Sequence, residues 1–213
     1  MICLAKKSPH RQILIDIDTQ SHFFRQRSSV CIRNPRGTLA NIRKVMGWAQ
    51  TYHIPTISTL QTPPSHSTCL HAPKTCRLSI NKPTCTVCRN HLCLPAADTL
   101  DWSISVWDRY DQIILQKRCF DPFEELRIDR IFTELPVEEY ILIGAPLEGA
   151  VKATALGLLL RGKRVTMVTN AIGELDQAAG QRMLDRMDAK GVRLVKANAL
   201  IRSQTSVPVM SLH

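Results

Sequence analysis

The sequence predicts an α/β protein with three layers, α-β-α, built on a parallel, Rossmann-like sheet of six strands and carrying a cysteine-rich insert. Short apolar runs alternate along the chain with longer segments whose apolar residues recur at helical spacing. This alternation is typical of parallel strands joined by crossover helices. The 213 residues suffice for one large domain, and 44% of them are hydrophobic against 22% charged, which is ordinary for a globular protein.

Two further expectations concern membranes and location. No run of about 18 apolar residues is present in the sequence, so no membrane-spanning helix is expected. Residues 1–10 place their short apolar patch before Lys6 and Lys7, which reverses the order of a secretory signal peptide. We therefore expect a cytoplasmic protein.

The first half of the chain predicts two strands and one helix. Gln12–Ile17, with the sequence QILIDI, is a short apolar run that ends in acids, as a buried parallel strand does. Residues 38–52 place apolar side chains on one helical face, and Thr38, after a glycine, is the expected N-cap. Residues 54–60 are expected to form the second strand.

Residues 61–98 are expected to form an insert within a single domain that spans residues 1–213. The segment contains five prolines, separated by Ser, Thr, Cys and His without a visible period: Pro63, Pro64, Pro73, Pro83 and Pro95. Because the segment has few apolar side chains, we expect something other than a hydrophobic core to hold it together.

Regular structure resumes in the second half of the chain. Strands are expected at 111–116, 140–143, 164–169 and 192–195, and helices at 123–134, 148–160 and 176–189, whereas the tail 198–213 shows no clear period. Strands of a parallel sheet end at the same edge, where ligands of such folds bind. Asp18, Lys117 and the turn at 144–149 each follow a predicted strand, so we expect them to share that edge.

Three stretches, taken in order, resemble the isochorismatase-like cysteine hydrolases, the superfamily that includes the nicotinamidases. They are ILIDIDTQSHFF at 13–24, QKRCFDPF at 116–123 and YILIGAPLEGAVKATALGLLLRGKRVTMVTNAIG at 140–173. The resemblance covers most of the chain apart from 61–98 and the tail. It implies a triad of cysteine, aspartate and lysine, in which the aspartate takes the proton of a nucleophilic thiol and the lysine helps to hold its charge. Asp18 and Lys117 occupy two of these positions, with Gln20 close to the first.

The third position departs from the family pattern. Aligning Gly144 and the run from Ala153 to Ala155 places Ala150 where the family has its cysteine, and alanine has no nucleophile. The resemblance also implies a cis peptide bond in this turn, at Ala145–Pro146, and an oxyanion-hole N–H at residue 146. Proline has no N–H. Together these departures predict a retained scaffold that has lost the reaction.

Two questions stay open at this stage. Cys119 lies two residues after Lys117 and is either a substitute nucleophile or a small buried apolar side chain. Asp18 and Lys117 either flank a cavity that binds a small polar or anionic ligand, or form an ion pair at the sheet edge.

The insert predicts a structural zinc site. Five of the eight cysteines fall between residues 69 and 93, and such clustering in a reducing compartment favours a metal over disulfides. Cys85 and Cys88 have the spacing with which one turn presents two thiolates to zinc. The other ligands are expected to be Cys76 and Cys93, with Cys69, His71 and His91 as alternatives. Free thiols, disulfides or redox use remain possible.

Charge is unevenly spread along the chain. Residues 1–100 hold 13 Lys and Arg against three acids, so the whole net charge of +10 lies there. This asymmetry is consistent with an anionic partner, namely nucleic acid, a phosphate-bearing ligand or an acidic protein face. The alternative is a solvated basic surface without a partner. The leading hypothesis is an isochorismatase-fold protein that acts by binding. The alternatives are an active hydrolase with another nucleophile and a nucleic-acid-associated protein, and family analogy suggests a homo-oligomer.

Overall fold

The computed structural model describes residues 11–26, 28–62, 91–94, 96 and 110–205. Its sheet has the strand order β3-β4-β2-β1-β5-β6-β7, and every neighbouring pair is parallel. The strands are β1 (Gln12–Ile17), β2 (Thr56–Gln61), β3 (His91–Leu94), β4 (Gln112–Lys117), β5 (Glu139–Gly144), β6 (Arg164–Ile172) and β7 (Arg193–Val195). The predicted α/β class with a parallel sheet is confirmed.

The sheet has one strand more than the six expected. The additional strand, β3, pairs with β4 at the edge of the sheet and falls inside the segment 61–98 that was expected to lack regular structure. It has only four residues, and Cys93 within it is exposed. So short an edge strand shows no hydrophobic period in the sequence, which is why it was missed.

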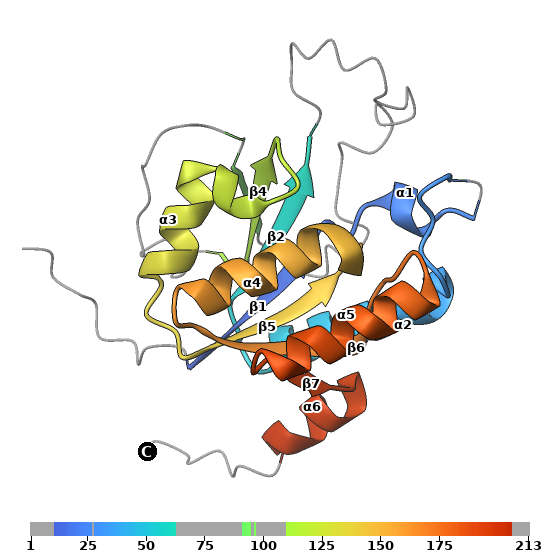
Figure 1. Cartoon of the computed structure of the whole chain (residues 1–213). Coiled ribbons are helices and arrows are strands. Elements are labelled where there is room, and N and C mark those ends of the chain that lie inside the picture. Colours follow the sequence, from blue (N-terminus) through green and yellow to red (C-terminus); the bar gives the residue numbers. More distant parts are fainter. Residues whose placement is uncertain (1–10, 27, 63–90, 95, 97–109, 206–213) are drawn as a thin grey trace, which may run out of the picture.

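Helices cover both faces of the sheet (Figure 1). They are α1 (Ser21–Phe24), α2 (Pro35–Thr51), the 3-10 turn η3 (Pro122–Glu124), α3 (Leu126–Glu134), the wide turn η4 (Leu147–Val151), α4 (Lys152–Leu160), α5 (Gln177–Ala189) and α6 (Ala197–Thr205). Helices α3, α4 and α5 share one buried cluster with β1, and helices α2 and α6 share another on the opposite face. Within the part of the chain described, no helix is both long and apolar enough to cross a membrane.

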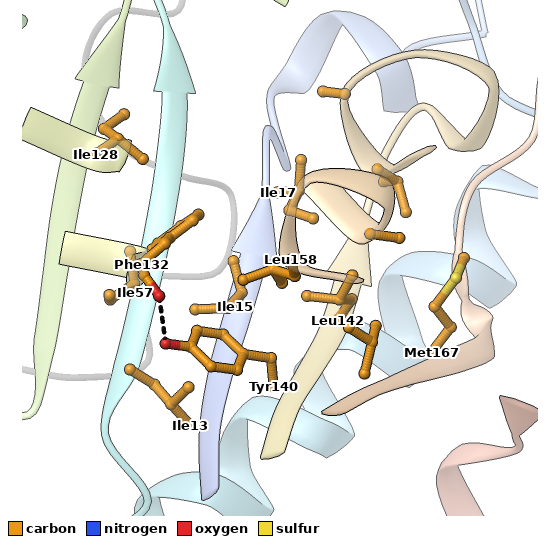
Figure 2. Close-up of a cluster of buried hydrophobic side chains, with 14 of the residues drawn as sticks. Ile13, Ile15, Ile17, Ile57, Ile128, Phe132, Tyr140, Leu142, Leu158 and Met167 are labelled. Carbon is orange, nitrogen blue, oxygen red and sulfur yellow. Dashed lines mark hydrogen bonds between the residues drawn. The ribbon is translucent and has the colours of Figure 1, made fainter. Parts of the chain in front are cut away.

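The larger core lies between the sheet and helices α3 to α5. Alternate residues of β1, namely Ile13, Ile15 and Ile17, point to this face and are fully buried beside Leu158 of α4 (Figure 2). Tyr140 brings a hydroxyl into this core, and that hydroxyl donates a 2.7 Å hydrogen bond to the carbonyl of Phe132. Burial raises the pKa of Tyr140, so the phenol stays neutral and its donor is satisfied.

Several helix boundaries differ from the expectation. Helix α2 begins at Pro35, and the side chain of Asn34 accepts the N–H of Gly37, so the cap is Asn34 and not Thr38. Proline is favoured in the first helical turn because its missing N–H is not needed there. The helix α6 was missed because its apolar signal, Ala197, Leu200 and Ile201, covers barely one turn.

Two of the expected helices are interrupted at their N-terminal ends. Residues 123–134 split into η3 and α3, with Asp121 accepting the N–H of Phe123 at 2.9 Å. The helix expected at 148–160 becomes regular only at Lys152, because Gly149 has the non-helical angles φ −111° and ψ −111°.

The order in which the strands are added to the sheet reverses between β1 and β5. From β1 the chain builds β2, β3 and β4 toward one edge, and then returns to β5 and builds β6 and β7 toward the other. Connections therefore leave β1 and β5 on opposite sides, and ligands of open α/β sheets bind at such a point. The residues that follow β1 and β5 are thus the first candidates for a site.

A buried polar network lies on the second face of the sheet. Asp16 accepts hydrogen bonds from the hydroxyls of Thr19 and Ser58, and Gln112 donates to Ser58 at 2.7 Å. The Gln112 Oε1 atom is buried without a hydrogen-bond partner. Burial, with a smaller contribution from the negative charge of Asp18, raises the pKa of Asp16 to about 6. With Asp16 ionised at neutral pH, the network has one hydrogen-bond donor too few, and the Gln112 Oε1 atom is left without one.

Replacing this carboxylate by an amide is expected to stabilise the fold at neutral pH. With its pKa raised from 3.8 to about 6, Asp16 binds a proton more tightly in the folded state. Its contribution to the free energy of unfolding therefore falls as pH rises from about 4 to 6. Asp16→Asn should raise that free energy at pH 7 by up to about 3 kcal/mol and flatten its pH dependence, as measured by urea unfolding between pH 4 and 7.

The matched control is Asp188→Asn, which changes an exposed carboxylate and should leave the pH profile unchanged. A lower free energy of unfolding for Asp16→Asn than for the wild type at pH 7 would contradict this account.

Candidate functional site

The candidate site is built around Asp18, the residue after β1. Its φ of 46° lies in the left-handed region, which aspartate tolerates better than most residues. The side chain is fully buried. One carboxylate oxygen accepts a 2.7 Å hydrogen bond from the hydroxyl of Thr59, and the other lies 2.7 Å from the Lys117 Nζ atom. The first oxygen is therefore hydrogen-bonded, whereas the second has the Lys117 charge beside it but no hydrogen-bond partner among the described residues.

Lys117, the last residue of β4, reaches across the end of β2 to meet this carboxylate. Its ammonium also donates to the backbone carbonyls of Cys119 at 2.9 Å and Phe120 at 3.2 Å. Lys117 is fully buried, so this is a dry ion pair whose ammonium donates two of its three N–H groups to backbone carbonyls.

The loop after Lys117 is held in place by Glu125. This carboxylate is almost completely buried and accepts from the backbone N–H of Arg118 at 2.7 Å and from its guanidinium at 2.9 and 2.8 Å. Such a bidentate clamp fixes both side chain and backbone. It sets the course of residues 118–120, whose carbonyls then reach the ammonium of Lys117.

Gln20 also follows β1, but its amide is used to join two strand ends. Its Nε2 donates to the carbonyl of Gln61 at 3.0 Å, and its Oε1 accepts the N–H of Gln61 at 3.2 Å. Gln20 is only 4% exposed. It therefore acts here as a connection between β1 and β2.

The turn after β5 occupies the other side of the crevice position. Gly144, with φ of 120°, pairs with Ile17, and a Cβ atom on it would lie 2.0 Å from the Ile17 carbonyl oxygen. Only glycine permits this approach. The N–H of Ala145 donates to the same carbonyl at 2.8 Å, and the Ala145–Pro146 peptide bond is cis. The turn is thereby pinned against the residue that precedes Asp18.

Ala150 lies in the wide turn that precedes α4. Its side chain is fully buried, and its carbonyl accepts the hydroxyl of Thr154 at 2.7 Å. The neighbouring Gly149 faces the ring of Phe120, which would be 3.0 Å from a Cβ atom at that position. Since the carbonyl of Phe120 binds Lys117, the turn and the ion pair are linked through one residue.

Cys119 has the electrostatics of a protonated thiol. A hydrogen bond with the Glu124 carboxylate raises the pKa of the Cys119 thiol, and burial and the negative charges of Glu124 and Glu125 raise it further. A nucleophilic cysteine needs the opposite, a lowered pKa. Cys119 therefore contributes its backbone carbonyl to Lys117 and not a thiolate.

The cysteine-rich part of the sequence lies largely outside the described residues. Of the expected zinc ligands, Cys69, His71, Cys76, Cys85 and Cys88 fall there, whereas Cys93 lies on β3 with its thiol exposed and 3.5 Å from the Gln116 side-chain nitrogen. His91 begins β3. Within the described ranges, no group of three or more His, Cys, Asp or Glu side chains is arranged to hold a metal ion.

Two residues around the ion pair were not singled out from the sequence, namely Thr59 and Glu125. Thr59 belongs to the Ser-Thr pair within the otherwise apolar run of β2, and polar residues inside a buried strand are a usable signal. Glu125 stood inside an expected helix, and nothing in its sequence context indicated the clamp on Arg118.

Comparison with known proteins identifies this architecture. The family model described as the isochorismatase domain matches residues 12–199. No curated protein matches the sequence. Among solved structures, the fold is similar to an isochorismatase-like hydrolase from Alkaliphilus metalliredigens, with a TM-score of 0.66 and 14% identity over 91% of this chain and 99% of that one.

Two other solved structures have a similar fold. The zinc complex of a pyrazinamidase from Pyrococcus horikoshii has a TM-score of 0.63 and 18% identity over 87% of this chain and 99% of that one. The MAR1 ribonuclease from Caenorhabditis elegans has a TM-score of 0.58 and 20% identity over 92% and 82%. At sequence identities of 14–20%, the similarity to these three structures shows a shared fold.

The geometry predicts strong coupling between Asp18 and Lys117. Lys117→Met leaves a buried carboxylate without its cation and is expected to lower the free energy of unfolding by about 3–5 kcal/mol. Asp18→Asn/Lys117→Met removes both charges, so it should be destabilised by clearly less than the sum of the two single variants. Urea unfolding of the four proteins measures this coupling, and additive effects would contradict a satisfied ion pair.

Proposed function

The chain belongs to the isochorismatase family, and we propose that it acts by binding, without the cysteine-dependent hydrolysis that the resemblance to the family implies. The observation that carries the proposal is Ala150, at the position that the resemblance assigns to the nucleophile. Its side chain is a buried methyl group, which has no electron pair with which to attack a carbonyl carbon.

The state of the other two triad positions supports the proposal. Asp18 and Lys117 use their carboxylate and ammonium on each other and on neighbouring protein groups. In a cysteine hydrolase the same groups would have a thiol proton to accept and a thiolate to stabilise. Without the thiol, the aspartate and lysine charges cancel each other.

The turn before Ala150 supports it independently. The resemblance implies that the N–H of residue 146 donates to an oxyanion, but Pro146 has no N–H. Loss of one such donor typically reduces the rate by a factor of about 10²–10³. The chain thus departs from the family chemistry at two positions with different roles, the nucleophile and the stabilisation of the oxyanion.

The same contacts bear on what this protein binds. A small polar or anionic ligand at Lys117 would compete for the buried ammonium with the Asp18 carboxylate and with two backbone carbonyls. This favours a macromolecular partner at the surface over a small ligand at the ion pair. Nucleic acid is one such partner class, and one protein of similar fold is named a ribonuclease.

A structural zinc ion is a second part of the proposal. Its support is the spacing of Cys85 and Cys88 and the proline-rich composition around them. Cys93, at the sheet edge, has an exposed thiol that is accessible to such an ion.

The first prediction concerns hydrolysis. Purified protein incubated with nicotinamide, pyrazinamide or isochorismate is expected to release product no faster than buffer, because Ala150 cannot attack. Ammonia release, or product analysis for isochorismate, measures this. Turnover that is lost in Cys119→Ser would identify Cys119 as the nucleophile, whereas turnover that survives in Cys119→Ser would sink both the non-catalytic proposal and the Cys119 alternative.

Restoring the thiol alone should not restore full activity. Ala150→Cys is expected to remain at least about 10²-fold below a nicotinamidase assayed in parallel, because residue 146 still lacks the N–H donor. Turnover of Ala150→Cys at the rate of that enzyme would show that the donor at 146 is unimportant.

The zinc proposal makes a separate prediction. Purified protein should carry about one zinc ion per chain, and Cys85→Ser or Cys88→Ser should lose it while the sheet domain stays folded. Elemental analysis with circular dichroism measures both, and Cys31→Ser, which changes a thiol beside α2, is the matched control. Metal-free wild-type protein with a protease-resistant insert would exclude this site.

A further inference from the structure

Ion pairs are unevenly distributed over the described part of the molecule. Every acidic partner in those pairs, apart from buried Asp18, lies between residues 125 and 139: Glu125, Asp129, Glu134, Glu138 and Glu139. These residues belong to α3, to the start of β5 and to the connections beside them. Arg164 of β6, Arg193 of β7 and Arg161, directly after α4, converge on them, so these positive charges are neutralised.

Helices α2 and α6 contrast with that arrangement. Neither helix contains an acidic residue. The α2 side chains of Arg36, Arg43 and Lys44 are exposed, as is Lys196 directly before α6. Among the described residues, none of these four has an acidic partner within ion-pair distance, and Lys44 donates to the neutral Asn198 side chain at 2.6 Å.

The two helices form one surface. Ile42, Val45 and Met46 of α2 share a buried cluster with Ala197 and Leu200 of α6. The hydrogen bond from Lys44 to Asn198 joins their solvent sides. We call this surface the α2–α6 face and define it by Arg36, Arg43, Lys44 and Lys196. Their positive charges lie on the same side of the sheet, so their electrostatic potentials add.

The kinds of side chain exposed on this face favour one class of anionic partner over the others. The outward stripe of α2 runs through the exposed residues Arg36, Ala40, Arg43 and Gln50 and the half-buried Gly47. It has no large apolar or aromatic side chain, and nothing lies within 4 Å of a Cβ built on Gly47. Protein interfaces need buried aromatic or aliphatic anchors, and membrane-surface helices need apolar side chains that enter the bilayer. A polar, flat, cationic face fits a phosphate backbone.

The spacing on α2 agrees with this choice. Arg36 and Arg43 are seven residues apart, which is two helical turns or about 10 Å along the axis. One strand of a nucleic acid carries a phosphate about every 3.4 Å along its axis, so the two guanidiniums span about three phosphates. Guanidinium binds phosphate through two parallel N–H donors.

We infer that the α2–α6 face binds the phosphodiester backbone of a nucleic acid. This inference names the partner of the binding role proposed above and rests on that proposal for its biological sense. The contacts are to phosphate and carry no base specificity. Binding should therefore be sequence-independent and strongly salt-dependent.

The test is fluorescence polarisation with a labelled 20-nucleotide single-stranded RNA and a labelled 20-base-pair DNA duplex, titrated with full-length protein from 50 to 250 mM NaCl. Wild-type protein should bind with a dissociation constant in the range of about 10⁻⁴–10⁻⁶ M for non-specific contacts. The two probes share the backbone chemistry, so their relative affinities decide between RNA and DNA as the source.

The decisive variant is Arg36→Gln/Arg43→Gln/Lys44→Gln. It should weaken binding at least tenfold at 100 mM NaCl and reduce the salt slope on single-stranded RNA by about 2, at about 0.7 per lost phosphate contact. Its control, Arg130→Gln/Arg164→Gln/Arg193→Gln, removes the same number of charges from ion-paired arginines and should change the affinity less than threefold. Thermal unfolding confirms that both variants are folded.

Several outcomes would overturn the inference. They are no binding by wild-type protein at 50 mM NaCl, equal weakening by the two variants, unchanged binding by the α2 variant, and competition by polyglutamate or anionic vesicles as effective as by unlabelled RNA. The ammonia assay and the integrity of the RNA after incubation report separately on catalysis. Amide hydrolysis or RNA cleavage, together with RNA binding that depends on α2, would contradict the non-catalytic proposal. It would not contradict the inference that the α2–α6 face binds nucleic acid.

Discussion

The buried pair of Asp18 and Lys117 is the interaction on which the carboxyl edge of the sheet depends. Two charges removed from water cost several kcal/mol each unless their hydrogen-bonding capacity is filled. Here Thr59 and the backbone of residues 119 and 120 supply hydrogen bonds, and the 2.7 Å contact between Asp18 and Lys117 supplies each charge with a counter-charge. To supply those acceptors, the loop after β4 must fold over the ammonium, and the Glu125 clamp on Arg118 holds it there. One ion pair thereby fixes the ends of β1, β2 and β4 relative to one another.

The same pair explains why the scaffold tolerates alanine at position 150. A thiolate in this crevice would bring a second negative charge to a site with one lysine. With a methyl group instead, the charges of Asp18 and Lys117 balance, and Ala150 joins the apolar cluster that contains Ile17 and Leu158. With alanine at this position, neither charge of the buried pair lacks a counter-charge. The fold can therefore accommodate the proposed loss of the reaction, because Asp18 and Lys117 remain ionic partners.

The parts of the structure that were predictable from the sequence are those with a strong local pattern. Gln12–Ile17 and the crossover helices have long apolar or amphipathic runs, and the common edge of Asp18, Lys117 and the turn follows from parallel strands alone. Strand β3 and helix α6 were missed because each buries too few side chains to produce a period. The roles of Thr59, Glu125 and Phe120 depend on contacts between residues distant in the sequence or within irregular loops, and no local pattern encodes them.

The uneven distribution of charge between the two faces of the sheet is not required by the fold. Parallel α/β sheets need helices on both faces, but they do not need those helices to differ in charge. Around α3 and the start of β5, arginines are met by carboxylates from Asp129 to Glu139. On the face of α2 and α6, the lack of acids leaves the arginines and lysines without ionic partners among the described residues. Unpaired like charges repel one another and lower stability, so a surface selected only for folding would pair them. The unpaired charges of the α2–α6 face therefore fit the phosphate backbone inferred above, because an external anion would relieve their mutual repulsion.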